Sequence, residues 1–317
     1  MGRELPERLR AALDGLLEGV SRHALAERSA ALTEAYRATG TARFSGRDDL
    51  IAYAVARMPA TFAAVSAALA ATLQRLGDWR PRTLLDLGSG PGTAVWAATE
   101  LIDAIESAAT VERDAGMLAL AAELGAPVPV ERRQGDLADT RTAFSMAGLV
   151  TAAYVLGELA LDSQTAVVSR AWAACSGVLL LVEPGTPAGA QRIQRARLQL
   201  IAAGAQVIAP CTHALACPLT TPSWCHFPAR LARSRAHMAA KGAVVPFEDE
   251  KFSYLAVSRL PVELLAAGRI VAPPAAAKPG TTFMVCRDGA LSQSLVPSRD
   301  RAAHKAARKL GWGDLLG

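Results

Sequence analysis

The sequence predicts an α/β fold built around a parallel β-sheet. Short apolar segments alternate with segments of helical periodicity, as repeated β-α-β units require. The predicted strands are 83–87, 108–112, 128–132, 148–155 and 177–182. A glycine-rich loop follows the first of these strands directly. The composition agrees with a folded protein, because 51% hydrophobic and 20% charged residues exclude an intrinsically disordered chain.

Residues 1–78 are predicted to form a helical region ahead of the sheet. Leu9, Ala12 and Leu16 recur at helical spacing, and a further helix is expected to begin near Pro59. We find no motif with a chemical function in this region. It is therefore interpreted as a structural addition to the sheet domain.

The rest of the chain is divided into three parts. Residues 79–205 are expected to contain the core of the sheet. Residues 206–250 are rich in Pro, Thr, His and Cys and are interpreted as an irregular insertion. Residues 251–317 are expected to supply the last two strands of the sheet, at 252–257 and 281–286, and then a basic helical tail.

The segment 86–92, with the sequence DLGSGPG, is the most informative local motif. Glycines after a strand let the backbone approach a ligand closely, and the N-terminus of the following helix favours an anion. The pattern D-x-G-x-G-x-G is similar to the S-adenosylmethionine-binding loop of class I methyltransferases, and it fits the dinucleotide fingerprint less well. Asp86 is expected to anchor the amino-acid part of the cofactor. The predicted cofactor-binding residues of the loop are Asp86, Gly88, Ser89, Gly90, Pro91 and Gly92.

Two further acidic residues follow the second and third predicted strands. Glu112 ends the second strand and can accept hydrogen bonds from both ribose hydroxyls of the cofactor. Asp136 follows the third strand and can accept one from the adenine amino group. Three acids in these positions favour S-adenosylmethionine. The alternatives are an α/β protein with an ordinary glycine turn and surface acids, and a nicotinamide-dependent enzyme.

The end of the fourth strand offers two candidate catalytic residues, Tyr154 and Glu158. Methyltransferases that act on amino groups carry Asn/Asp-Pro-Pro-aromatic here, and those that act on cytosine C5 carry a nucleophilic Cys. The segment 151–159, TAAYVLGEL, has neither pattern. Glu158 is a candidate general base or cofactor contact, and Tyr154 could stack on a base, but both are equally compatible with a structural role. The sequence therefore supports cofactor binding more firmly than methyl transfer.

Four cysteines are candidate metal ligands. With no secretion signal visible, thiolate ligation is favoured over a disulfide framework. The predicted ligands are Cys211, Cys217, Cys225 and Cys286. This spacing can suit a [4Fe–4S] cluster, with three ligands from one loop and a fourth from a distant strand. Zinc is the alternative, with His213 or His226 in place of Cys286, and a third interpretation is that these cysteines are small buried apolar residues.

The positive charge of the chain is unevenly distributed. The net charge is +5, and residues 184–247 contain no Asp or Glu. Segregated basic surface of this kind is typical of proteins that bind polyanions, with nucleic acid as the leading candidate. Solvated helix faces are the alternative. The predicted RNA-binding residues are Arg230, Arg233, Arg235 and Lys241.

We expect a cytoplasmic protein that does not enter a membrane. The longest uncharged stretch, 198–229, contains several Pro, His and Cys residues and is not a transmembrane segment. The first residues, MGRELPERLR, are charged and lack the apolar region of a signal peptide.

The motifs together resemble a known family, the methyltransferase-like proteins of the small ribosomal subunit in mitochondria and bacteria. The resemblance covers roughly residues 40–315. It is carried by the glycine loop, by YVLGEL at 154–159, by WCHF at 224–227 and by PFEDEKFSY at 246–254. The last two blocks are the specific ones.

This resemblance implies a class I methyltransferase fold and an association with small-subunit rRNA during ribosome assembly, with no DNA partner. It also implies a [4Fe–4S] cluster held by the four cysteines. Three functions are therefore considered. The first is an S-adenosylmethionine-dependent methyltransferase-like protein that acts on small-subunit rRNA. The others are a non-catalytic assembly factor that binds the cofactor and the cluster, and a small-molecule methyltransferase with a structural zinc site.

Overall fold

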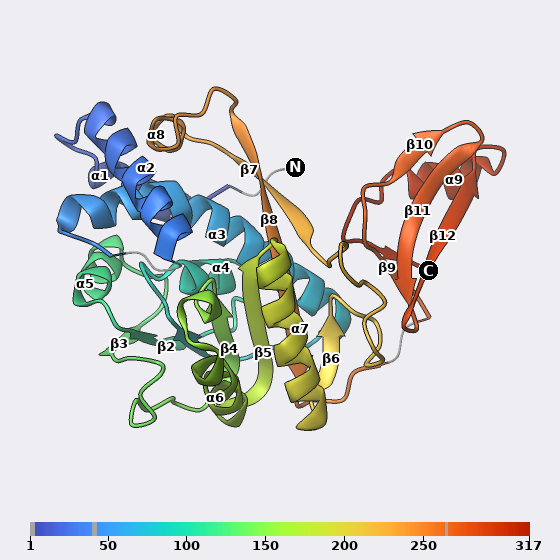
Figure 1. Cartoon of the computed structure of the whole chain (residues 1–317), viewed down its shortest axis with the longest axis horizontal. Coiled ribbons are helices and arrows are strands. Elements are labelled where there is room, and N and C mark those ends of the chain that lie inside the picture. Colours follow the sequence, from blue (N-terminus) through green and yellow to red (C-terminus); the bar gives the residue numbers. More distant parts are fainter. Residues whose placement is uncertain (1–3, 40–42, 264–265) are drawn as a thin grey trace.

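The structure is a computed structural model, and it describes residues 4–39, 43–263 and 266–317 (Figure 1). Within these residues the strands form a large sheet of eight strands, flanked by helices, and a separate sheet of five strands near the end of the chain. The smaller sheet stands beside the main body in Figure 1.

Three helices precede the main sheet. They are α1 (Glu7–Gly15), α2 (Arg22–Thr39) and α3 (Arg47–Leu76). The helix expected to begin near Pro59 is α3, which begins at Arg47 instead and carries Pro59 in its interior. A proline inside a helix is unfavourable locally, but burial overrides this preference because Pro59 lies in the buried part of α3.

Helix α3 is long and apolar enough to cross a membrane by these two criteria alone. However, 72% of its most apolar 18-residue window is buried inside the fold. Its alanine-rich faces pack against α2, α4 and β8. Helix α3 therefore packs inside this fold as its central helix.

The main sheet has the strand order β3-β2-β1-β4-β5-β8-β6, and β7 pairs with β8. Its strands are β1 (Thr83–Leu87), β2 (Ser107–Glu112), β3 (Val130–Gln134), β4 (Ala147–Ala153), β5 (Cys175–Pro184), β6 (Gln206–Ala209), β7 (Phe227–Ala232) and β8 (Phe247–Ser258). Strands β1 to β5 are parallel, and β8 runs antiparallel between β5 and β6. This order, with one antiparallel strand near the edge, is that of class I methyltransferases and confirms the predicted fold class.

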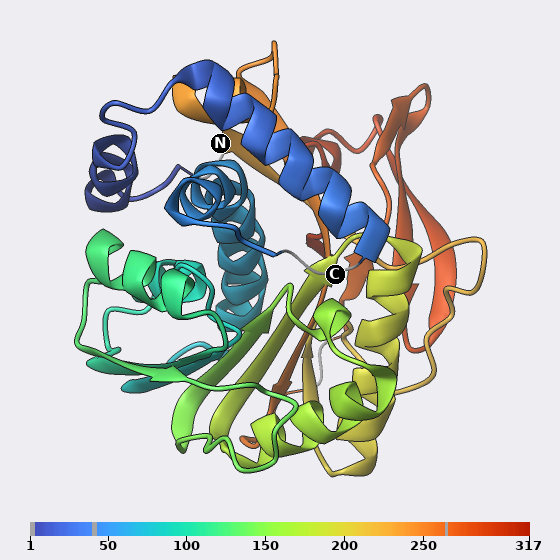
Figure 2. The ribbon, with the colours of Figure 1, turned by 60° about the vertical axis from the view of Figure 1, so that its left-hand side comes forward.

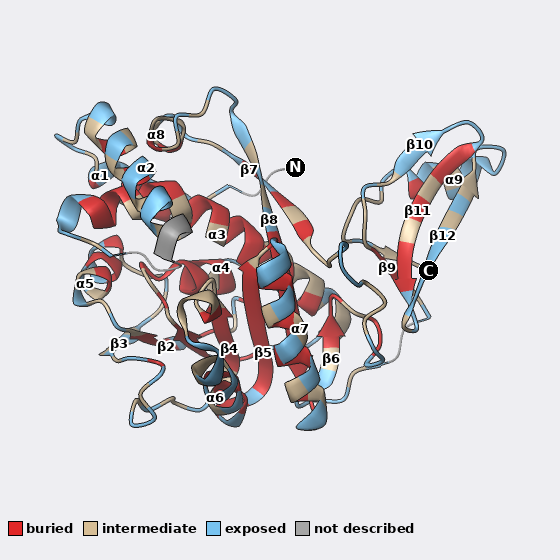
Figure 3. Cartoon of the chain, in the orientation of Figure 1, coloured by how far each residue is buried: buried red, intermediate tan, exposed pale blue. Residues whose placement is uncertain are grey.

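Helices cover both faces of the main sheet (Figure 2). They are α4 (Thr93–Leu101), α5 (Ala115–Leu124), α6 (Leu161–Ala173) and α7 (Pro187–Ala202), with a short 3₁₀ helix, η1 (Leu156–Glu158). Alternate residues of β5 face opposite layers: Leu180 packs in the cluster of α3 and α4, whereas Leu179 and Leu181 pack with α6 and α7. Because both faces are covered, the central strands are almost continuously apolar and buried (Figure 3).

The segment 206–250 is more ordered than the sequence predicted. It contains strand β6 of the main sheet, strand β7 and helix α8 (Arg235–Ala240). An irregular Cys-rich insertion before the last two strands is therefore not confirmed. The short strand β6 was missed because four residues with one polar position carry little periodicity, and β7 forms only by pairing with the distant β8.

The strand predicted at 281–286 does not belong to the main sheet. It is part of β11 (Gly280–Arg287), which forms the second sheet with β9 (Gly268–Ile270), β10 (Ala275–Ala277), β12 (Ala290–Pro297) and β13 (Leu315–Leu316). Helix α9 (Arg301–Ala307) covers this sheet, and Phe283 and Val285 form its own small core with Ala307. The missed signal is Asp288-Gly289, both with positive φ, which is a strong hairpin turn between β11 and β12.

A buried ion pair fixes the loop after β4. The carboxylate of Glu183, at the end of β5, is fully buried and accepts a hydrogen bond from Arg192 Nε at 2.6 Å. Its other oxygen accepts one from the backbone N–H of Leu156 at 3.0 Å. A Cβ at Gly157 would lie 2.9 Å from the Arg192 guanidinium. The pair therefore holds η1 against α7.

We predict that Arg192→Met lowers the free energy of unfolding by about 3–5 kcal/mol, because it leaves a buried carboxylate unpaired. The matched control is Arg195→Met, on the exposed side of the same helix, which should change it by less than about 0.5 kcal/mol. Urea denaturation measures both. Equal effects of the two substitutions would contradict the structural role given to the pair.

Candidate functional site

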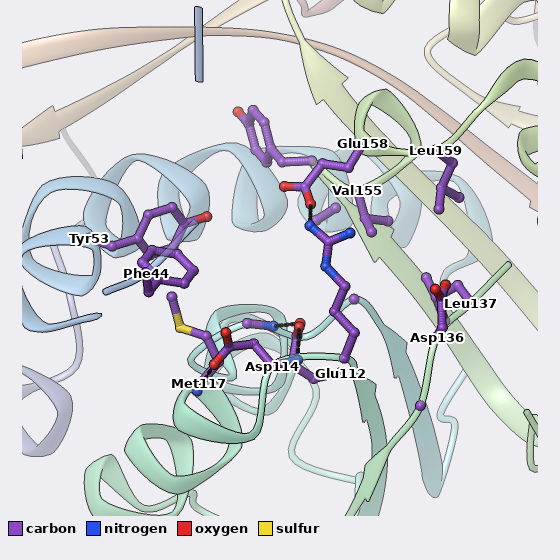
Figure 4. Close-up of a pocket in the computed structure, with 16 residues that line it drawn as sticks. Phe44, Tyr53, Glu112, Asp114, Met117, Asp136, Leu137, Val155, Glu158 and Leu159 are labelled. Atoms are coloured by element: carbon purple, nitrogen blue, oxygen red, sulfur yellow. Dashed lines mark hydrogen bonds and ion pairs between the residues drawn. The ribbon is translucent and has the colours of Figure 1, made fainter. Parts of the chain in front are cut away.

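A cavity opens at the carboxyl ends of the parallel strands, where ligands bind in open α/β sheets (Figure 4). The glycine loop after β1, the end of β2, the turn after β3 and the end of β4 each contribute to its wall. A second, smaller cavity adjoins it and shares Tyr53, Gly88, Gly90 and Tyr154. The four predicted segments therefore converge on one place.

The glycine loop is shaped by close contact with the end of β4. Gly88 has φ +67°, and a Cβ there would lie 2.3 Å from Val155 Cγ2. Only glycine fits this approach. Gly90 has φ +50°, but a Cβ on it would meet no protein atom within 4 Å. Its open side belongs to the cavity wall, so the space beside Gly90 is available to a ligand.

Asp86 lies at the base of the smaller cavity and is almost fully buried. Its Oδ1 accepts a hydrogen bond from Thr151 Oγ1 at 2.8 Å, and its Oδ2 has no partner. Burial raises the pKa of this carboxyl from 3.8 to about 7, and the nearby Glu112 adds to the effect. A buried acceptor without a donor is unfavourable, and it suits a ligand that brings a positive charge or an N–H group.

Glu112 and Asp136 border the larger cavity (Figure 4). Glu112 is held by two backbone groups, since it accepts hydrogen bonds from the N–H of Gly90 at 2.8 Å and of Asp114 at 3.0 Å. Asp136 is exposed, and its Oδ1 accepts one from the N–H of Ala138 at 2.8 Å. Both carboxylates keep further lone pairs for a ligand.

Tyr154 and Glu158 border the same cavity, but each already has a partner. The Tyr154 hydroxyl donates to Glu250 Oε1 at 2.9 Å, and Tyr154 itself has φ +59°, which is strained for a non-glycine residue. Glu158 pairs with Arg113 at 2.9 Å. Burial raises the pKa of Glu158 to about 7 even though Arg113 opposes the change. Such a value suits a general base near neutral pH.

Two aromatic residues of the N-terminal region also border the cavity, which the sequence did not indicate. Tyr53 comes from α3, and Phe44 precedes this helix. Their ring centroids are 5.3 Å apart in an edge-on arrangement (Figure 4). The helical region therefore closes one side of the cavity. The sequence signal for this contact was weak: one aromatic residue before an alanine-rich helix and one within it.

The four candidate cysteines come together from two segments, the loop between β6 and β7 and the strand β11. Cys211 and Cys217 follow β6, Cys225 precedes β7, and Cys286 lies on β11. Burial raises the pKa of the Cys225 and Cys286 thiols, and both are close enough to Cys211 and Cys217 that a negative charge on either of these raises it further. All are free thiols. In the part of the chain that the structure describes, no three His, Cys, Asp or Glu side chains are arranged to hold a single metal ion.

Two buried arginines lie beside these thiols. Arg197 is 1% exposed and Arg269 is 2% exposed. Burial raises the pKa of the Cys211, Cys225 and Cys286 thiols; Arg197 opposes this change at Cys211 and Cys286, and Arg269 opposes it at Cys225. Both arginines donate to backbone carbonyls, Arg197 also lies beside the Cys211 thiol, and three of their side-chain nitrogens have no oxygen or nitrogen partner. Neither forms an ion pair with an acid among residues 4–39, 43–263 and 266–317.

Most of the predicted RNA-binding residues are paired with acids of β8. Arg230 makes two hydrogen bonds with Asp249, at 2.7 and 2.6 Å. Arg233 and Lys241 both pair with Glu248, at 3.1 and 2.5 Å. Residues 184–247 contain no acid, but several of their cations lie beside acids in the folded protein. The reason is that β7 pairs with β8, which begins Phe-Glu-Asp-Glu. Arg235 is exposed.

The family of this chain follows from comparison with known sequences. Residues 47–317 match the family model described as mitochondrial small ribosomal subunit Rsm22. The chain belongs to this family. The human protein called mitochondrial ribosome assembly protein METTL17 is 31% identical over 297 residues. The match covers 84% of this chain and 62% of METTL17, so this chain spans less than two thirds of that relative.

Solved structures similar to this member of the Rsm22 family include methyltransferases. A putative RNA methyltransferase from Pyrococcus horikoshii is 16% identical, with a TM-score of 0.40, and the match covers 62% of this chain and 81% of that one. The magnesium protoporphyrin IX methyltransferase of Synechocystis, with bound S-adenosylmethionine, is 12% identical, with a TM-score of 0.41. That match covers 81% of this chain and all of the other. These likenesses are distant.

We predict that Asp86 makes stability depend on pH. Between about pH 4 and pH 7 the folded protein retains a proton on Asp86 that the unfolded chain has lost. The stability contributed by Asp86 therefore falls as pH rises through this window, by at most about 1.4 kcal/mol per pH unit, and levels off above it.

Denaturation of the wild type and of Asp86→Asn at several pH values tests this. The difference in unfolding free energy between the two should change between pH 4 and pH 7 and stay constant above pH 8. Asp78→Asn, which removes an exposed carboxylate, is the control and should give a constant difference. A constant difference for Asp86→Asn as well would contradict the burial given to this side chain.

Proposed function

We propose that this protein is an S-adenosylmethionine-dependent, methyltransferase-like protein that acts on small-subunit rRNA during ribosome assembly. The observation that carries the proposal is the position of Asp86, Glu112 and Asp136 around two adjoining cavities, at the ends of three adjacent parallel strands. Membership of the Rsm22 family and the likeness to a human ribosome assembly protein support a ribosome-related partner.

The three acids match the three polar parts of the cofactor. Asp86, buried with one unpartnered oxygen, would accept from the ammonium of the methionine part, whose charge favours the ionised carboxylate. Glu112 would accept from the ribose hydroxyls, and Asp136 from the adenine amino group. The open side of Gly90 leaves room between them. When bound, S-adenosylmethionine supplies an electrophilic methyl group.

The residues at the end of β4 would face the methyl acceptor. Glu158, with a pKa near 7, is proposed as the group that takes a proton from the acceptor. Tyr154 is held by Glu250 and would form a wall for the acceptor base. Methyl transfer needs mainly correct positioning, so these two residues and a docked RNA would be sufficient.

We also propose that the four cysteines hold a [4Fe–4S] cluster. The donor set is four thiols, and the two buried arginines beside them lack a counter-anion, which a cluster bound by four thiolates would supply. A single zinc ion needs four donors about 2.3 Å from one point, and the described residues hold no such group. A cubane binds each thiolate at a separate iron, so its ligands surround the cluster and need not meet at a single point.

We predict that Gly90→Leu abolishes cofactor binding, because the new side chain fills the open side of the loop. The matched control is Gly204→Leu, which also has positive φ and open space but lies in the turn after α7. Both substitutions should lower stability by about 1–2 kcal/mol through backbone strain. Isothermal titration with S-adenosylmethionine should show loss of binding for Gly90→Leu only. Equal affinities of the two variants would overturn the loop assignment.

Methyl transfer is tested with S-adenosylmethionine labelled in its methyl group and immature small ribosomal subunits. We expect label in the rRNA with the wild type and none with Gly90→Leu. If the protein binds both cofactor and subunits but leaves the rRNA unlabelled, transfer is excluded and a non-catalytic assembly factor is the correct description. Label in a protein component would overturn the rRNA substrate.

We predict that Cys217→Ser and Cys225→Ser lose bound iron and acid-labile sulfide when the protein is purified without oxygen. The control is Cys175→Ala, a thiol on β5 outside the group, which should retain both. Loss of the cluster should also destabilise the protein, because Arg197 and Arg269 would remain buried without an anion. Stoichiometric zinc in the wild type, with no iron, would overturn the cluster.

A further inference from the structure

All of the net positive charge of the protein lies near the end of the chain. Residues 266–317 contain eight Lys and Arg residues and three Asp residues, a net charge of +5, which equals that of the whole chain. Residues 1–265 therefore carry 26 basic and 26 acidic residues and are neutral overall. The second sheet and α9 therefore carry an excess of positive charge, whereas the rest of the chain taken as a whole carries none.

Most of this excess is displayed on α9 and the residues next to it. Five cations there are exposed, and none of them forms an ion pair in the described chain. They are Arg299, Arg301, Lys305, Arg308 and Lys309, which we call the α9 basic surface. The one acid within 299–309 is Asp300, which is occupied as the N-cap of α9, accepting from the N–H of Ala303 at 3.1 Å.

The geometry of α9 fixes these cations on one side. Arg301, Lys305 and Arg308 are spaced i, i+4 and i+7, so they share one face of the helix. The helix is anchored at other positions, because Ala307 packs into the small core and His304 contacts Thr281 on β11 at 3.3 Å. The helix cannot turn its basic face inward, and the cations form a fixed array.

A sixth cation extends this surface. Lys278 is exposed in the turn between β10 and β11. The neighbouring carbonyl of Pro279 accepts hydrogen bonds from both the N–H and the hydroxyl of Ser298, at 2.8 Å each. This contact places the backbone of the turn directly beside the start of the α9 basic surface.

The other basic region has a different charge balance. Of the residues of β7 and α8 that the sequence predicted to bind RNA, Arg230, Arg233 and Lys241 face Asp249 or Glu248. A cation that is already paired with a carboxylate gains less free energy from binding a phosphate, because its ion pair with the carboxylate must first be broken. The α9 basic surface has no such competitor.

We infer that the α9 basic surface is where this protein docks the phosphate backbone of RNA, an inference that rests on the proposed action on rRNA. An array of exposed, unpaired Arg and Lys residues complements a polyanion. The five residues include no aromatic side chain that could stack on a base. The surface therefore positions the RNA, and selection of the modified or bound site belongs to the cavity side of the molecule.

Two double variants with equal loss of charge test this inference. One is Arg301→Ala with Lys305→Ala, and the control is Arg230→Ala with Arg235→Ala. Alanine suits the exposed helix positions of α9, so folding should be kept, and thermal unfolding with S-adenosylmethionine titration verifies it. The probe is transcribed small-subunit rRNA, and its affinity is measured from 50 to 300 mM salt.

We expect the α9 variant to bind rRNA on the order of tenfold more weakly at low salt, with its log–log salt slope reduced by about 1.4–1.8 for two lost phosphate contacts. The control variant should change the slope by less than half as much, because Arg230 is already paired. Equal affinity of the α9 variant and the wild type would overturn this docking surface, and equal weakening of both variants would overturn its assignment to α9.

Two further outcomes separate this inference from the proposed function. If the wild type does not bind rRNA at all, the proposed RNA partner fails and the docking inference fails with it. If the α9 variant binds free rRNA normally but no longer associates with immature small subunits, the surface docks a protein, and RNA is overturned as its occupant while the proposed function stands.

Discussion

Strand β8 is the element on which the other parts of the structure depend. Its second half completes the main sheet by running antiparallel between β5 and β6, and its first half extends beyond the sheet to pair with β7. This extension carries three consecutive acids. Glu250 accepts a hydrogen bond from Tyr154 at the cavity, and Glu248 pairs with Arg233 and Lys241, which follow β7 and α8. Further along, Ser253 Oγ donates to the carbonyl of Cys225 at 2.7 Å and so ties the thiol region to the same strand.

The parallel core of the main sheet could be predicted because its central strands, β1, β4 and β5, are largely apolar on both faces and each is followed by a turn and a helix. The second sheet could not, since an apolar strand such as 281–286 looks the same whichever sheet it joins. Its Asp288-Gly289 turn was the local evidence for a hairpin. Strand β7 is a different case, because its residues become a strand only through pairing with β8.

The candidate site could likewise be predicted only in part. Asp86, Glu112 and Asp136 could be placed because in this fold the position of a residue at a strand end determines its place in the cavity. Their partners could not be placed. The contact between Tyr154 and Glu250 joins residues 96 positions apart, and the pairing of Arg230 with Asp249 depends on a strand register. The distribution of charged residues along the sequence is therefore a weak guide to the distribution of charge on the folded protein.

The backbone of Tyr154 stores strain at the edge of the cavity. A non-glycine residue at φ +59° costs about 1–3 kcal/mol, and glycine would remove this cost. Tyrosine there is retained against that penalty by the carboxylate of Glu250, which its hydroxyl reaches from the wall of the site. Glycine at this position would therefore relieve the backbone strain, but it would lose the packing of the ring against the core and the hydrogen bond to Glu250, and it would open this edge of the cavity to water.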